Sequence, residues 1–76
     1  MPKFTLTWST KDLDQFAGEV ALEGISEHEV RKLLGLRPTD LLIGEFRLSP
    51  SQIKTVAKFV ETKIDTTAYD YFITPT

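Results

Sequence analysis

The residues of this chain that could do chemistry are few, and their spacing forms no catalytic set. His28 is the single histidine, and it stands between Glu27 and Glu29 where a helix is expected to begin. The chain has no cysteine for a Cys-His pair, and no credible Ser-His-Asp arrangement surrounds His28. The four glycines are isolated, so a glycine-rich phosphate loop is absent. We therefore predict that the protein is not an enzyme.

Pairs of acidic residues offer the only other candidates for a chemical site. Asp12 with Asp14, and Glu27 with Glu29, could in principle bind a cation. No metal-binding loop pattern surrounds either pair. The sequence predicts no metal site and no cofactor, and a binding module becomes the default expectation.

The charges are unevenly spread, although the formal net charge is only −2. The segment from Asp12 to Val30 holds six acidic residues and no Lys or Arg, whereas lysines gather between Lys54 and Lys63. An acidic band repels nucleic acid and attracts basic proteins, although acids are also common on any solvated surface. We expect a basic protein as partner and no nucleic acid.

Length and hydropathy restrict the class of protein further. A chain of 76 residues is expected to form one domain, residues 1–76, that is too small for a deep catalytic cleft. No apolar run approaches the roughly 18 residues of a membrane span, and no basic-then-apolar leader precedes Trp8. The lack of cysteine suits a reducing compartment. The expectation is a cytoplasmic protein with no membrane contact.

Alternation of apolar and polar residues predicts four strands, at residues 3–9, 16–22, 42–48 and 69–74. Gly18 within the second strand is typical of a bulge, which would move Phe16 to the opposite face, so the side of Phe16 stays open. Capping boxes at Ser26 and Ser49 predict helices over 27–34 and 50–63.

The order ββαβαβ predicts an α+β fold, a four-stranded antiparallel sheet with two short helices on one face. The covered face is predicted to carry Phe4, Leu6, Trp8, Val20, Leu22, Phe46, Leu48, Tyr71 and Ile73. Nothing remains to cover the opposite face, which is predicted to carry Thr5, Thr7, Glu19, Glu45, Arg47, Asp70 and Phe72. An aromatic such as Phe72 on an uncovered face is either a lone surface residue or a binding anchor.

Several short motifs, in order along nearly the whole chain, resemble the cloacin immunity family. They are Leu6-Thr7-Trp8, Phe16, Gly18-Glu19, Leu34-Gly35, Gly44-x-Phe46, Ile64-Asp65 and Tyr71-Phe72. Members of that family protect cells from cloacin, colicins and pyocins whose toxic domain cuts 16S ribosomal RNA. The resemblance implies a four-stranded antiparallel sheet and tight binding to a basic ribonuclease domain.

The resemblance also implies which residues contact the toxin. The aromatic contacts would be Phe16 and Phe72, and Glu45 matches a position that distinguishes one toxin from another. This chain has Ser9 where the family has an aromatic residue, and Glu45 where cysteine is frequent. It is also less acidic than the family, and residues 49–60 read as a more regular helix. These departures leave the identity of the toxin open.

The expected mechanism is steric and electrostatic. Phe16 and Phe72 would anchor the contact, the acids of the open face would pair with toxin Lys or Arg, and Arg47 would add selectivity. The predicted toxin-binding residues are Thr7, Phe16, Glu19, Glu45, Arg47, Asp70 and Phe72. The free protein is expected to be a monomer that forms a 1:1 complex. The alternatives are an RNA-binding module, which an acid-rich sheet face disfavours, and a homodimer joined through the open face.

Overall fold

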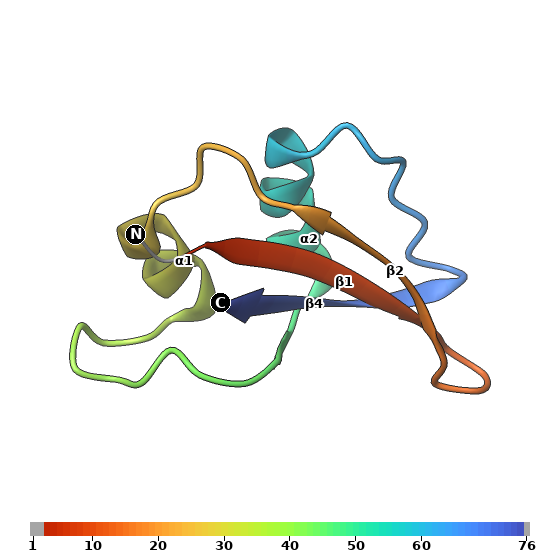
Figure 1. Ribbon diagram of the computed structural model, residues 1–76, viewed down its shortest axis with the longest axis horizontal. Coiled ribbons are helices and arrows are strands. Elements are labelled where there is room, and N and C mark those ends of the chain that lie inside the picture. The colour runs from red at the N-terminus through yellow and green to blue at the C-terminus, as the bar shows by residue number, and fades with distance from the viewer. Residues whose placement is uncertain (1–2, 76) are drawn as a thin grey trace.

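The structure is a computed structural model that describes residues 3–75. Its four strands are β1 (Phe4–Thr10), β2 (Phe16–Ala21), β3 (Phe46–Arg47) and β4 (Tyr69–Pro75), and its helices are α1 (Glu27–Leu34), α2 (Pro50–Val56) and the 3-10 turn η1 (Ala57–Phe59). The strands form one antiparallel sheet in the order β2-β1-β4-β3, with β1 and β4 side by side at its centre (Figure 1). The predicted α+β fold and strand order along the chain are confirmed.

Both helices begin where the sequence predicts, because a capping box satisfies the first free backbone N–H groups. The Ser26 hydroxyl accepts a hydrogen bond from the Glu29 backbone, and the Glu29 carboxylate accepts one from the Ser26 backbone. Ser49 and Gln52 form the same reciprocal pair at the start of α2. Gly35 ends α1 in the left-handed conformation, φ 71°, which glycine adopts without steric cost.

The core lies between the sheet and the two helices. Val30 of α1 and Val56 of α2 are fully buried against the strands, so both helices cover the same sheet face. All nine residues predicted for that face are buried or packed against the core. Trp8 lies over Gly18 of the neighbouring strand and against Tyr71, with ring centroids 5.8 Å apart. The predicted assignment of the covered face is confirmed.

The predicted strand over 42–48 is wrong in length, because only Phe46 and Arg47 pair with β4. Gly44 has φ 84°, a left-handed conformation that interrupts the extended chain. The preceding loop is held by Arg31, whose Nη1 donates to the Arg37 carbonyl at 2.9 Å and to the Asp40 carbonyl at 2.6 Å. Ile43 is consequently 71% exposed in a loop.

The predicted helix over 50–63 is also too long. Regular α-helix ends at Val56, η1 adds one turn, and Val60 is extended with φ −134° and ψ 152°. The segment that begins at Val60 also contains Thr62 and Ile64, and the β-branched side chains of these three residues favour extended backbone. The buried Tyr71 hydroxyl accepts a hydrogen bond from the Asp65 backbone N–H at 2.8 Å, so tertiary contact holds this segment as a loop.

Candidate functional site

The register of the sheet brings four of the predicted binding residues into one row across all four strands. Thr7 of β1 lies opposite Glu19 of β2 on one side and Phe72 of β4 on the other. Arg47 of β3 lies opposite Phe72. We call Glu19, Thr7, Phe72 and Arg47 the central row. Directly paired residues project to the same side of a sheet, so the four side chains share the face away from the helices.

A second row contains Phe16, Ser9 and Asp70. The register of β1 against β2 shifts between Trp8 and Ser9, so that Ser9 pairs with Phe16 instead of Ala17. This is the effect of a β-bulge, which moves the side chain of Phe16 by one position. The sequence left the side of Phe16 undecided. The structure places it in register with Ser9, next to the central row, with 62% of the residue exposed.

No helix covers this side of the sheet within residues 3–75. Its members are half-buried or exposed, and none of them is buried. We call this surface the open face, formed by Thr5, Thr7, Ser9, Phe16, Glu19, Arg47, Asp70, Phe72 and Thr74. Its middle is occupied by short hydroxyl side chains, and its two phenylalanines stand on either side of them.

Asp70 differs from the other acids of the open face because two cations already contact it. Its Oδ1 lies 3.0 Å from Arg47 Nη2 and 3.4 Å from Lys11 Nζ. The Asp70 side chain is 19% exposed, whereas that of Arg47 is 69% exposed. The half-buried carboxylate of Asp70 therefore holds the exposed guanidinium of Arg47 in position. Lys11 is a second partner of Asp70 that the sequence analysis did not predict. Lys11 follows the end of β1, and only the pairing of β1 with β4 reveals this proximity.

Glu19 and Glu45 are exposed and form no ion pair with another residue of the described part of the chain. Glu19 lies in the central row, but Glu45 precedes β3 and takes no part in the strand pairing. The open face is thus charged differently at its two edges. Glu19 on β2 and Arg47 on β3 are separated by three strand spacings, or about 14 Å.

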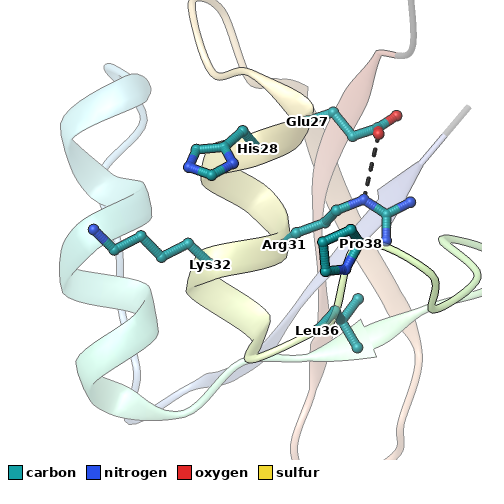
Figure 2. A pocket seen from close by; sticks show the side chains of 6 residues that line it. All are labelled: Glu27, His28, Arg31, Lys32, Leu36 and Pro38. Atoms are coloured by element: carbon teal, nitrogen blue, oxygen red, sulfur yellow. Dashed lines mark hydrogen bonds and ion pairs between the residues drawn. The ribbon is translucent and has the colours of Figure 1, made fainter.

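A shallow hollow lies on the other side of the molecule, between α1 and the loop that follows it (Figure 2). It contains His28, the single histidine, with Lys32 one turn further along α1. Arg31 is already engaged there, with its Nε 3.3 Å from a Glu27 carboxylate oxygen and its Nη1 on two loop carbonyls. Arg31 thus ties the loop after α1 to the helix.

Two features are absent from residues 3–75. No group of three His, Cys, Asp or Glu side chains comes close enough together to hold a metal ion. No described helix has both the length and the apolar composition needed to cross a membrane.

The fold and the open face define a small α+β protein that presents one uncovered side of an antiparallel sheet. Residues 3–74 match the family described as "Domain of unknown function (DUF7683)", and the chain belongs to this family. No curated protein matches the chain. The family description states no activity and no partner, so it assigns no role to any residue. The resemblance to the cloacin immunity family remains a prediction.

Proposed function

We propose that this chain is an immunity protein, which binds and inhibits the nuclease domain of a toxin of the 16S-ribosomal-RNA-cleaving type through its open face. The observation that carries the proposal is the location of Phe16 and Phe72 on a sheet face without a covering helix. An inhibitor of a ribosome-directed toxin acts in the cytoplasm and needs neither cofactor nor membrane. The complex would contain one copy of each protein.

The two phenylalanines supply the anchors of this interface. Protein interfaces take most of their binding free energy from a few aromatic or arginine side chains near the centre, which fill pockets on the partner. Phe72 is in the central row, and Phe16 is in the adjacent row on the far side of Ser9. Thr7 and Ser9 between them are short, so the open face offers two aromatic projections with a lower floor between them.

The charges fit a basic partner with one acidic contact. Glu19 and Glu45 are available to pair with Lys or Arg on the nuclease. Arg47 uses one Nη2 contact on Asp70 and retains other N–H groups for a carboxylate of the partner. Charges of opposite sign across an interface speed association and exclude the wrong partners. Arg47 is thus the selective contact, and Glu45 distinguishes among toxins.

An RNA-binding module is the alternative that the exposed aromatics allow. RNA-binding sheets stack bases on aromatic side chains and carry Lys or Arg beside them. Here Arg47, which pairs with Phe72, shares the carboxylate of Asp70 with Lys11, and Glu19 is in the same row as Phe72. This arrangement weakens the attraction for phosphate, and we therefore expect no binding to single-stranded RNA.

The test is co-expression with the C-terminal domain encoded by the reading frame immediately upstream. We expect a basic nuclease domain there, growth arrest when it is expressed alone, and rescue by the wild-type chain. Phe72→Ala should weaken binding by about 2 kcal/mol or more and reduce rescue, while the helix-side control Glu61→Lys should rescue fully. Full rescue by Phe72→Ala would contradict the open face as the site. An upstream frame without a toxic domain would contradict the immunity role.

A further inference from the structure

We infer that the open face also binds a second copy of this chain, by packing face to face about a two-fold axis. The axis would run parallel to the strands and between β1 and β4, which are the central strands of the sheet. This inference goes beyond the proposed function, because it requires only the chain itself.

The first support is the distribution of charge in the central row. A two-fold axis along the strands reverses the strand order of the second copy, so that β2 faces β3. Glu19 at one edge would then lie over Arg47 of the second copy, and Arg47 over Glu19 of the second copy. The same operation creates two opposite-charge contacts and no contact between like charges within this row. Closed two-fold contacts require this kind of self-complementary surface.

The second support is the distribution of side-chain size. In the same arrangement Phe72 of the first copy lies over Thr7 of the second, and Phe72 of the second copy lies over Thr7 of the first. A large side chain thus meets a short one twice. In the neighbouring rows Ser9 meets Asp70, and Thr5 meets Thr74, which are pairs of hydrogen-bonding or small groups. Sheets that pack face to face require such interlocking of their side chains.

The size of the face indicates that this dimer is weak. β1, β2 and β4 have six or seven residues each and β3 has two, so the sheet covers at most about 19 by 20 Å, and each copy would bury at most about 400 Å². The total of about 800 Å² is below the roughly 1,200 Å² at which stable interfaces begin. The chain would then be monomeric when dilute and dimeric when concentrated. A nuclease domain that covers the same face would compete with the second copy.

Sedimentation equilibrium of the purified chain, from about 10 µM to 1 mM at low salt, tests this inference. We expect a concentration-dependent dimer that weakens with added salt, because the paired charges are near the rim. Glu19→Lys and Arg47→Glu should each weaken self-association by at least about tenfold, since each places like charges opposite one another. Glu61→Lys is the matched control and should dimerise like the wild type.

An equimolar mixture of the two single variants separates this arrangement from other dimers. In a mixed pair the new lysine faces the new glutamate, while the original Arg47 faces the original Glu19, so both contacts are favourable. We expect the mixture to dimerise at least about tenfold more tightly than either variant alone. Circular dichroism would verify that Arg47→Glu, which also loses the contact with Asp70, remains folded. If it unfolds, Arg47→Gln, which removes the positive charge without adding a negative one beside Asp70, takes its place.

Three results would overturn the inference. They are a wild-type chain that stays monomeric at 1 mM, single variants that dimerise as the wild type does, and a mixture no tighter than its components. None of them bears on toxin binding, which is measured separately by rescue of growth.

Discussion

The indole ring of Trp8 occupies the space that a side chain at Gly18 would fill. A Cβ atom built on Gly18 would lie 2.5 Å from Cζ2 of Trp8 and 2.7 Å from Cε2. These residues pair directly between β1 and β2. The close approach explains why a glycine is needed inside this strand, and it adjoins the shift of register that turns Phe16 toward the open face.

This contact predicts that Gly18→Ala destabilises the protein. The added methyl group would force Trp8 away from Tyr71, and overpacking of this kind costs about 1–3 kcal/mol. Urea unfolding followed by Trp8 fluorescence measures the change. Ala21→Ser, an exposed change on the same strand, is the control and should leave the midpoint unaltered. An unchanged midpoint for Gly18→Ala would show that the indole moves without cost.

A second prediction concerns the hydroxyl of Tyr71, which accepts the hydrogen bond from the backbone of Asp65. Tyr71→Phe leaves that partly buried N–H without its acceptor, so we expect a loss of about 1–2 kcal/mol. Hydrogen exchange of the Asp65 amide should accelerate more than exchange in β1. Tyr69→Phe is the matched control, since the Tyr69 hydroxyl makes no hydrogen bond with a described residue. Equal effects of the two changes would contradict a tether at Tyr71.

A third prediction concerns the carboxyl group of Asp65. Its pKa is below the ordinary value because the Thr67 hydroxyl donates to Oδ1 at 2.6 Å, and the Thr67 backbone N–H donates at 3.1 Å. Thr67→Val removes the hydroxyl donor, so the pKa of Asp65 should rise toward its ordinary value. Titration of the side-chain carboxyl carbons by NMR measures this rise. The carboxyl of Asp40, whose low pKa is due to Arg37, should titrate as before and serves as the internal control.

The lowered pKa of Asp65 also gives the sign of a stability change with pH. Because the carboxylate is favoured in the folded state, its contribution is present above the unfolded pKa of about 3.9. That contribution is lost as the pH falls through the lower folded pKa. Between about pH 4 and pH 2, the free energy of unfolding should therefore decline less steeply with falling pH in Thr67→Val than in the wild type. A steeper decline would contradict the assignment.

The fourth prediction rests on the proposed function and concerns the rate of toxin binding. Exposed acids such as Glu19 and Glu45 should steer a basic nuclease, so the association rate should fall steeply with added salt. The dissociation rate should change less, because salt at about 0.15 M screens charges beyond about 8 Å and acts little inside a desolvated contact. Stopped-flow kinetics across a salt series measures both rates.

The same kinetics locate the binding surface. Glu45→Lys should slow association and reduce rescue from the toxin, because it places a like charge opposite the basic partner. Glu61→Lys changes the net charge by the same amount away from the open face, and it should have a much smaller effect. If the two variants are equally impaired, steering depends on net charge and not on the position of Glu45 beside β3.

Local patterns in the sequence determined most of the architecture. Alternation of apolar and polar residues predicted three of the strands to within one residue and the correct set of covered side chains. The capping boxes at Ser26 and Ser49 predicted both helix starts. These features are decided by neighbours within a few positions, through the period of the strand and the reach of a cap. The sequence could therefore specify which face of the sheet is open.

The tertiary structure decided what the open face presents. Phe16 joined it through a change of register between β1 and β2, and Asp70 received Lys11 and Arg47 from two other segments. The hydrogen bond from the Asp65 backbone to Tyr71 holds the end of the predicted second helix as a loop. The short β3 has a local cause instead, since Gly44 turns the chain there. Strand pairing and ion pairs join residues far apart in the chain, so no local pattern in the sequence records them.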